Sequence, residues 1–440
     1  MRSITFQQKI AGLAGVFRSL QYRNYRLFFG GQSLSLIGTW IQRIALPWLV
    51  YDLTNSAFLL GLVGFAGQIP LFLMAPFAGV LADRWNRYYM LIATQIAAML
   101  QALALAALYF TGTIQVWQII ALAVFLGCVN AFDVPIRQSF VVDMVDRKED
   151  LGNAIALNSS MFNAARLLGP SIAGLLISFT SEGICFLLNG VSYLFVIASL
   201  LLMRIPKRKR EVRNQRIFTE LKDGFSYAFG FAPIKYIILL LALVSLIGMP
   251  YVVLMPVFAR EVLHGDSHTF GFLMGATGLG ALAGAIYLAS RKNVVGLEKV
   301  IPIAATCFGV GLIVFSFTRF FGISLLLMTL VGMGMMLQIA SSNSIIQTVV
   351  DDDMRGRVMS FYLMAIGGIA PFGSLLAGSL ATTIGVPHTF LIGGSFILAG
   401  AILFSLKCNE IKMLIQPIYE KMGIYSEKEM KVQPEMGRQK

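Results

Sequence analysis

Twelve long apolar runs alternate with short hydrophilic breaks along the 440 residues of the chain. A helix needs roughly 20 predominantly apolar residues to cross a hydrocarbon core about 30 Å thick, and each run approaches that length. The pattern predicts an all-α integral membrane protein with about twelve transmembrane helices. The predicted spans are 27–50, 58–81, 88–110, 114–136, 153–179, 184–203, 234–258, 269–289, 300–317, 322–349, 358–381 and 388–405.

The composition supports the same class of protein. Hydrophobic residues make up 57% of the chain and charged residues 13%, whereas soluble domains are about 45–50% apolar and about 25% charged. The four cysteines are scattered and form no CxxC pair, so we expect neither a disulfide framework nor a metal site. No cofactor is expected, since the sequence contains no Walker A, HExxH or GxSxG motif.

Basic residues are distributed unevenly between the two sides of the predicted membrane. With the N-terminus placed in the cytoplasm, the inside segments hold 31 of the 35 lysines and arginines when Lys235, at the cytoplasmic end of the seventh span, is counted with them. Arg260 and Arg319 fall outside, and Arg43 and Arg166 lie within spans. Because cytoplasmic loops retain lysine and arginine, we expect both termini in the cytoplasm. The net charge of +13 then reflects orientation and attraction to anionic lipid rather than nucleic-acid binding.

The longest hydrophilic break divides the chain into two similar halves. We expect a six-helix half at 1–203, a basic cytoplasmic linker at 204–233, a second six-helix half at 234–405 and a cytoplasmic tail at 406–440. Short pairs recur at similar topological places: Leu60-Gly61 and Phe270-Gly271, Val142-Asp143 and Val350-Asp351, Ala173-Gly174 and Ala377-Gly378. Two such repeats with a substrate site between them are typical of secondary transporters.

The break after the second span carries the most specific motif, Gly79-Val-Leu-Ala-Asp83-Arg84-Trp-Asn86-Arg87. Gly79 permits two helices to approach closely. Asp83 can accept charge-assisted hydrogen bonds from an arginine or a helix N-terminus. If these bonds form in one conformation only, the segment is a latch; the alternative is a solvated turn at the end of a helix.

This segment resembles the signature loop of the major facilitator superfamily, G-x-x-x-D-R-x-G-R-R, with Asn86 and Tyr88 in place of a glycine and an arginine. Asparagine tolerates the left-handed backbone, so we expect the turn to survive. A wider match, over 17–63, Asp133–Gln138 and Ala165–Gly174, resembles the branch that holds enterobactin exporters and macrolide-efflux proteins. The resemblance implies two six-helix bundles, a gating loop at Gly79, Asp83, Arg84 and Arg87, and no enzymatic activity.

Polar residues recur at helical spacing within three of the predicted spans, so each set shares one helix face. Such stripes line a cavity or form hydrogen bonds between helices. The proposed cavity-lining residues are Gln32, Ser35, Thr39, Gln42 and Arg43 in the first span, Ser159, Asn163 and Arg166 in the fifth, and Gln338, Ser341 and Ser342 in the tenth.

Asp133 is the one carboxylate that the sequence places well inside a span, away from its outer edge. Arg137 follows at i+4, on the same helix face. Two interpretations stay open: a structural ion pair between Asp133 and Arg137, or a proton-coupling site with a pKa shifted by burial.

The resemblance implies an alternating-access secondary transporter of the bacterial cytoplasmic (inner) membrane. We expect export of a bulky organic molecule, either a siderophore or an amphiphilic antibiotic, coupled to an inward proton gradient. Arg43 and Arg166 would suit an anionic substrate and count against cationic macrolides. The expected partners are this small molecule, membrane lipid and protons, with the chain acting as a monomer. The alternatives are uptake or facilitated diffusion, and a non-transporting receptor or assembly protein on the same fold.

Overall fold

The computed structural model describes residues 17–84, 86–204, 217–291 and 293–424, without the side chains of 75–84, 148 and 217–221. All regular structure in these ranges is helical. Eleven helical segments are long and apolar enough to cross a membrane. Helix α2 (Arg23–Thr54) is the twelfth; its run of Gly, Gln, Ser and Thr lowers its hydropathy, although its 32 residues span far more than the hydrocarbon thickness. The predicted all-α, twelve-helix fold is confirmed.

The chain forms two compact units, which we describe separately. Unit 1 comprises Met1–Arg213 and Val253–Gly275, and unit 2 comprises Asn214–Val252 and Ala276–Lys440. Unit 1 therefore contains the first six spans and, in addition, the end of the seventh span and the beginning of the eighth.

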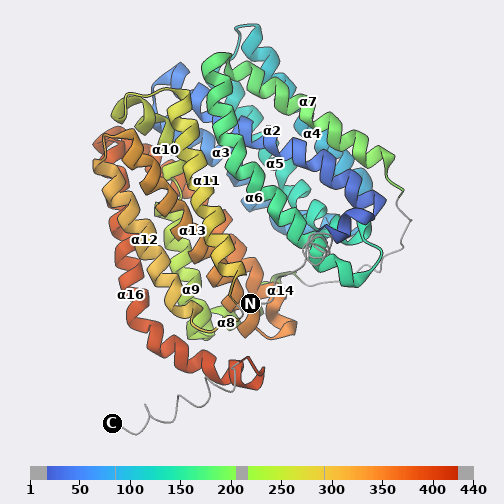
Figure 1. Ribbon diagram of the computed structural model, residues 1–440, viewed down its shortest axis with the longest axis vertical. Coiled ribbons are helices and arrows are strands. Elements are labelled where there is room, and N and C mark those ends of the chain that lie inside the picture. Colours follow the sequence, from blue (N-terminus) through green and yellow to red (C-terminus); the bar gives the residue numbers. More distant parts are fainter. Residues whose placement is uncertain (1–16, 85, 205–216, 292, 425–440) are drawn as a thin grey trace, which may run out of the picture. The chain divides into compact units, whose positions relative to one another are not determined.

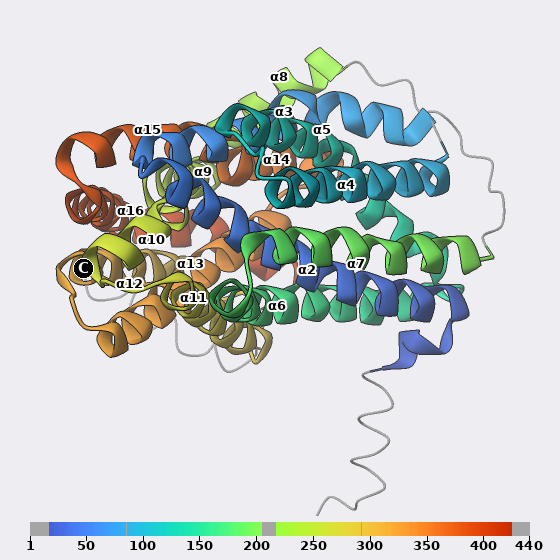
Figure 2. The same cartoon turned by 90° about the horizontal axis from the view of Figure 1, so that it is seen from above.

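Unit 1 is built from six long helices and short connecting turns. Helix α2 packs against α6 (Lys148–Phe179) and α7 (Glu182–Leu202), and α7 also packs against α4 (Arg87–Phe110). Helix α3 (Ala57–Arg84) packs on α5 (Val116–Phe140). Helices α2, α4, α6 and α7 run side by side in Figures 1 and 2. The unit also contains the short elements η1 (Arg18–Gln21), η2 (Val141–Met144) and η4 (Phe258–Val262), together with residues 253–257 of α10 (Tyr251–Val257) and 267–275 of α11 (Ser267–Ala289).

One end of unit 1 is fastened around the buried carboxylate of Asp150. Arg18 forms an ion pair with it at 2.5 Å, and the Tyr22 hydroxyl donates a hydrogen bond to it. This hydrogen bond raises the pKa of Tyr22, so the phenol stays a protonated donor at neutral pH. The contacts bind η1 to the start of α6 and fix where α2 begins.

In unit 2, α12 (Leu297–Phe317) packs against α13 (Phe321–Val349) and α16 (Val386–Lys421). Gly309 and Gly394 allow α12 and α16 to touch: a Cβ on Gly309 would lie 2.8 Å from the Gly394 carbonyl oxygen. Small residues permit this close approach in lipid, where no hydrophobic force drives helices together. Helix α16 continues past the predicted span 388–405 to Lys421.

Two spans that belong wholly or partly to unit 2 are interrupted by π-helical turns. One span consists of α9 (Ala232–Leu243), η3 (Val244–Gly248), α10 (Tyr251–Val257) and η4; the other consists of α14 (Asp352–Leu363), η5 (Met364–Gly368) and α15 (Ala370–Ile384). The Ser245 hydroxyl in η3 donates a hydrogen bond of 2.6 Å to the Ile366 carbonyl in η5. Single π turns inside α-helices often occur at functional sites.

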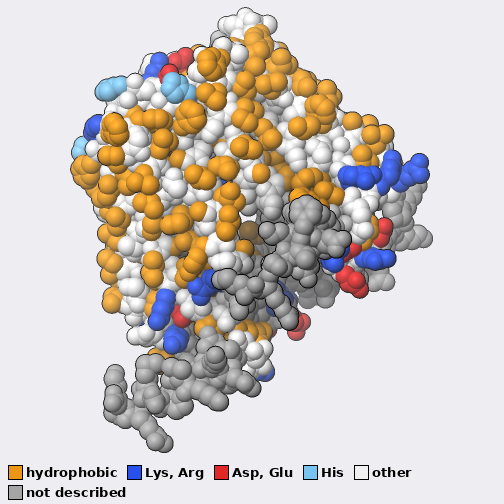
Figure 3. Space-filling view, viewed as in Figure 1, with side chains coloured by type: hydrophobic (Ala, Val, Ile, Leu, Met, Phe, Trp, Pro, Cys, Tyr) orange, Lys and Arg blue, Asp and Glu red, His pale blue; other side chains and the backbone are white. Residues whose placement is uncertain are grey.

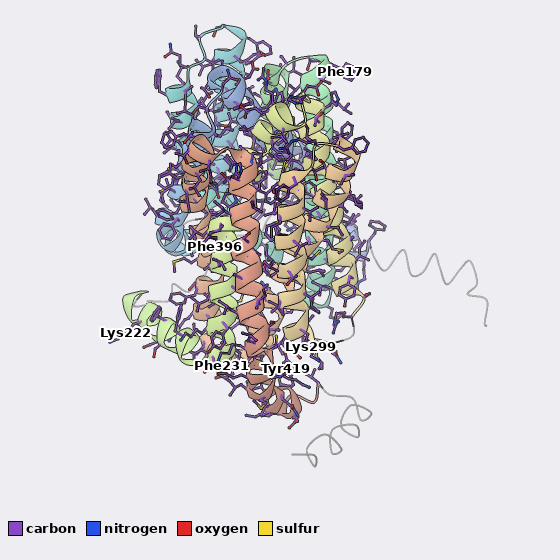
Figure 4. The ribbon with its side chains drawn as sticks, turned by 90° about the vertical axis from the view of Figure 1, so that its left-hand side faces the viewer. Phe179, Lys222, Phe231, Lys299, Phe396 and Tyr419 are labelled. Carbon is purple, nitrogen blue, oxygen red and sulfur yellow. The ribbon has the colours of Figure 1, made fainter. Side chains whose placement is uncertain are left out.

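The surface of unit 2 is organised like that of a membrane protein. Apolar side chains cover the middle of α12 and α13, whereas lysine and arginine gather near one end (Figure 3). Phe396 points outward from the middle of α16, while Lys299, Phe231 and Tyr419 lie toward one end of the unit (Figure 4). Exposed apolar side chains in the middle of these helices are expected where lipid is the solvent.

The predicted linker 204–233 contains a further helix, α8 (Ile217–Gly230), which packs on α14. Asp223 forms an ion pair with Arg357 at 3.3 Å, and the Tyr227 hydroxyl donates to Asp351 at 3.0 Å. Burial raises the pKa of the Tyr227 phenol, so it remains a donor at neutral pH. The part of the linker at 205–216 lies outside the described residues.

Candidate functional site

The structure places Asp133 in a polar site between α4 and α5. Its Oδ1 atom accepts hydrogen bonds from Gln95 Nε2 at 2.6 Å and Thr94 Oγ1 at 3.0 Å. Its Oδ2 atom lies 3.2 Å from Arg137 Nε, which is an ion pair at i, i+4. The Asp133 residue is only 7% exposed. A buried carboxylate needs such partners, because removing a charge from water without them is costly.

A second polar group joins three helices of unit 1. Gln42 on α2 donates to Gln101 on α4 at 3.0 Å and accepts from Asn189 on α7 at 2.7 Å. All three side chains are buried. Gln42, proposed above as a cavity-lining residue, therefore forms hydrogen bonds between helices in this structure.

Arg43, one residue further along α2, has a different environment. Its guanidinium lies 4.9 Å from the centre of the Trp40 ring, a cation–π distance. Its electrostatic neighbours are Tyr193, Arg137 and Arg166, so like charges face it from α5 and α6. The Arg43 side chain is exposed at the surface, although protein atoms surround it on many sides.

The position of Trp40 is set by the glycine of the Gly169-Pro170 segment. A Cβ on Gly169 would collide with the Cβ of Trp40, so glycine lets α6 approach α2 at this level. Phe162 on α6 contacts the Trp40 ring edge-on at 5.9 Å. The result is an aromatic wall next to the Arg43 guanidinium.

The other predicted residues of unit 1 lie on the same two helices. Gln32 and Ser35 are buried, and the Oε1 atom of Gln32 has no hydrogen-bond partner among the described atoms. Thr39 donates to the Ser35 carbonyl at 2.9 Å. On α6, Ser159 is exposed and Asn163 donates to its carbonyl oxygen at 2.9 Å.

The predicted stripe of unit 2 is fully buried on α13. Both polar side-chain atoms of Gln338 and the hydroxyls of Ser341 and Ser342 have no hydrogen-bond partner within the described part of the chain. Buried polar groups are almost always paired with protein or with ordered water. These four atoms lie within two turns of one helix.

The predicted gating loop is described only in part. The side chains of Gly79, Asp83 and Arg84 lie outside the described residues, and Arg87 begins α4. Asn86 does not use the left-handed backbone that asparagine tolerates. Asn86 has φ −73° and ψ 111°, and its Oδ1 atom accepts a 3.0 Å hydrogen bond from the Tyr88 amide. It is the N-cap of α4, a position that asparagine favours.

Four partners of these sites were not predicted: Thr94, Gln95, Gln101 and Asn189. They were detectable as isolated polar residues inside the third and sixth apolar runs. In lipid, such residues seek polar partners on neighbouring helices.

Comparison with known proteins supports the transporter class. The model of the family described as "transmembrane secretion effector" matches residues 14–431. The staphyloferrin A transporter of Staphylococcus aureus is 26% identical over 392 residues, covering 89% of this chain and 98% of its own length. Macrolide efflux protein A of Streptococcus pyogenes is 24% identical over 406 residues, covering 90% and 99%. The multidrug efflux pump Tap of Mycolicibacterium fortuitum is 24% identical over 399 residues, covering 86% and 95%.

Solved structures show the same fold. The nucleoside transporter NupG aligns with a TM-score of 0.69 at 14% identity, over 88% of this chain and 99% of that one. A POT family transporter in complex with a thioalcohol-conjugated peptide aligns with a TM-score of 0.71 at 13% identity, over 88% and 96%.

The family match and these relatives identify the chain as a membrane transporter. The chain belongs to the transmembrane secretion effector family of the major facilitator superfamily. It is a multi-pass protein of the bacterial inner membrane and not an enzyme.

Proposed function

We propose that this protein exports a bulky organic molecule with anionic groups by alternating access, and that inward movement of protons drives export. The substrate class proposed is a siderophore. Both termini would lie in the cytoplasm, and the chain would act as a monomer in lipid.

The observation that carries the substrate class is the environment of Arg43. It is an accessible guanidinium in unit 1, stacked on Trp40, with Arg137 and Arg166 as charged neighbours. A cation at membrane depth needs water or an anionic partner. Carboxylates and catecholates of a siderophore would supply that partner, because guanidinium binds such planar anions with two parallel hydrogen bonds.

The relatives support export in general and this substrate class in particular. One relative is a staphyloferrin A transporter, and two others are a macrolide efflux protein and a multidrug efflux pump. An amphiphilic antibiotic is the second candidate substrate. The aromatic wall of Trp40 and Phe162 favours it, since an apolar ring system would stack there.

Asp133 is the candidate for proton coupling. Its ionised carboxylate is held by Thr94, Gln95 and Arg137. A proton on Asp133 would dissolve the ion pair and leave the charge of Arg137 available, close to Arg43. Proton binding and substrate binding would then be linked through the charge of the site, and linkage between the two ligands is what coupled transport requires.

The test uses inside-out vesicles that contain the full-length protein. Staphyloferrin A and a macrolide are offered separately, with and without an acidified vesicle interior. We expect the siderophore to accumulate and the acid interior to increase its accumulation. Accumulation of the macrolide alone would favour the second substrate class. Accumulation that ignores the pH gradient would refute proton antiport, and accumulation only in right-side-out vesicles would indicate uptake.

A further inference from the structure

A cluster of polar side chains joins the end of α2 to η4 in unit 1. It is separate from the Asp133 site, which lies on α4 and α5. We call it the clasp and define it as Tyr51, Asp52, Arg260 and Glu261. The Tyr51 hydroxyl donates a short hydrogen bond to the Glu261 carboxylate. Arg260 forms an ion pair with Asp52 at 2.7 Å. These bonds join residues about 210 positions apart, from the first and the seventh spans.

Aromatic side chains pack next to the clasp. The Arg260 guanidinium lies 5.9 Å from the Trp48 ring and 6.0 Å from the Tyr51 ring. Trp48 in turn stacks on Phe270 of α11 (Ser267–Ala289) at 6.1 Å with an interplanar angle of 16°. Below it, α11 touches α6: a Cβ on Gly271 would lie 2.7 Å from the Gly174 Cα atom.

Alternating access, on which this inference rests, requires each face of a transporter to open in turn. The clasp joins helices that belong to different six-helix repeats of the sequence, and opening of this face separates such repeats. The clasp therefore has to break in every cycle. Whatever weakens it favours the state open to this face.

Among the groups of the clasp, Glu261 is both accessible and directly bonded across the interface. Its side chain is exposed, while its partner Tyr51 is buried. The hydrogen bond to a charged acceptor is worth about tenfold in an equilibrium constant. Asp52 and Arg260 are about half exposed, and an ion pair of that kind contributes little.

We propose that Glu261 is a proton-responsive residue of the transport cycle: a proton taken up by its carboxylate weakens the clasp and favours opening of this face. The face would be the extracellular one, because Arg260 falls on the side opposite to the basic loops. Protons from the acidic side would then favour the conformation that releases an exported substrate.

Other titratable groups surround the clasp and serve as controls. Asp266, in the connection that follows η4, pairs at 2.6 Å with His268 in the first turn of α11, and His264 precedes both. Tyr109 of α4 is close enough to Asp52 to act on it electrostatically and donates to Glu182 of α7 at 2.9 Å. Of these groups, histidine is the one with an ordinary pKa nearest to neutrality.

The experiment measures conformation and needs no substrate. Spin labels are placed on Thr113→Cys and Phe320→Cys, both exposed, in full-length protein whose four native cysteines are replaced by alanine. Distances between the labels are measured by double electron–electron resonance in lipid nanodiscs at pH 7.5 and 4.0, because glutamate side chains take up a proton only at roughly pH 4 to 4.5. We expect a longer-distance population to grow at pH 4.0. In Glu261→Gln this population should be raised about tenfold relative to the closed one at pH 7.5, and should no longer respond to pH.

Three further variants make the result decisive. Tyr51→Phe leaves the carboxylate in place and should lose the pH response as well, which covers the case that Glu261→Gln fails to fold. Asp52→Asn and His268→Gln should keep the response. A response that survives in Glu261→Gln, that disappears in Asp52→Asn or His268→Gln instead, or that is absent from the parent protein would overturn the proposal. Because no transport is measured, failure of siderophore export in vesicles would leave this result unaffected.

Discussion

A single arginine near the middle of a span costs roughly 2.5–3.5 kcal/mol on insertion scales, so its presence needs a reason. Arg137 has an evident one, since Asp133 lies 3.2 Å away. Arg43 is different, because the described contact of its guanidinium is the face of Trp40. A cation–π contact at an accessible site contributes about 0.5–1 kcal/mol, less than the insertion cost. The difference is consistent with the substrate-binding role that we propose for Arg43.

The first prediction concerns Arg43→Gln. We expect it to raise the KM for an anionic siderophore about tenfold with little effect on kcat, because one charge-assisted hydrogen-bond pair is lost. The measurement is concentration-dependent transport in inside-out vesicles. Arg319→Gln, at an exposed loop position, is the matched control and should leave the KM unchanged. An unchanged KM in Arg43→Gln would remove this residue from the substrate site.

The second prediction concerns Asp133→Asn. The amide oxygen can still accept hydrogen bonds from Thr94 and Gln95, but the ion pair with Arg137 is lost. We therefore expect a folded protein that binds substrate and no longer responds to a pH gradient. Transport in vesicles with and without the gradient, compared with substrate binding to purified protein, provides the test. If the response persists, Asp133 has a purely structural role.

At this scale the sequence allowed part of the site to be predicted. The Asp133–Arg137 pair follows from i, i+4 spacing on a helix, and the structure contains it. The partners on α4 depend on which helices are neighbours and on how each is rotated. The periodicity of polar residues shows how a single helix is rotated, but it does not show which helices are neighbours. Thr94, Gln95 and Asn189 could therefore not be assigned to their sites.

At the scale of elements, close helix approach in unit 1 depends on glycine where α6 meets α11. A Cβ on Gly271 would lie 2.6 Å from the Pro170 carbonyl oxygen and 2.7 Å from the Gly174 Cα atom. Both atoms belong to the backbone, so no rotation of a side chain relieves the clash. The pairs Phe270-Gly271 and Ala173-Gly174 appeared in the sequence only as parts of the internal repeat.

The third prediction follows from this contact. We expect Gly271→Ala to lower the apparent melting temperature of detergent-solubilised protein by several degrees, because overpacking typically costs about 1–3 kcal/mol. Gly30→Ala is the matched control: Gly30 also lies in a long helix, but an added Cβ would meet nothing within 4 Å. The control should melt at or slightly above the parent temperature, since alanine is the better helix former. Equal melting of the two variants would show that α6 and α11 are not in close contact.

Helix existence was predictable at this scale, whereas helix ends and irregular turns were not. The apolar runs locate all twelve spans because lipid demands a fixed apolar length. The helix of the predicted span 388–405 continues to Lys421 in the structure. Membrane thickness sets the length of the apolar run, but it does not set where the helix ends in water. The π turns η3 and η5 leave no period in the sequence that differs from an ordinary helix.

At the scale of the whole molecule, the distribution of charge is the strongest feature that bears on orientation. The inside segments of the predicted topology hold 31 of the 35 basic residues. The two basic residues on the outer side are both bound locally: Arg260 forms an ion pair with Asp52, and Arg319 donates to the carbonyls of Ser316 and Thr318.

The last prediction tests this orientation, on which the directions of export and of proton movement both depend. Reporter domains fused within 207–216 should report the cytoplasm, because this segment carries the densest run of lysine and arginine. Fusions within 265–267, next to the clasp, should report the opposite side. Alkaline phosphatase and a fluorescent protein that folds only in the cytoplasm give complementary signals at each position. Agreement of both fusions on one side would refute the twelve-span topology. A swapped result would keep the topology but invert it, so that the clasp would close the cytoplasmic face and proton uptake by Glu261 would have to be reassigned to that face.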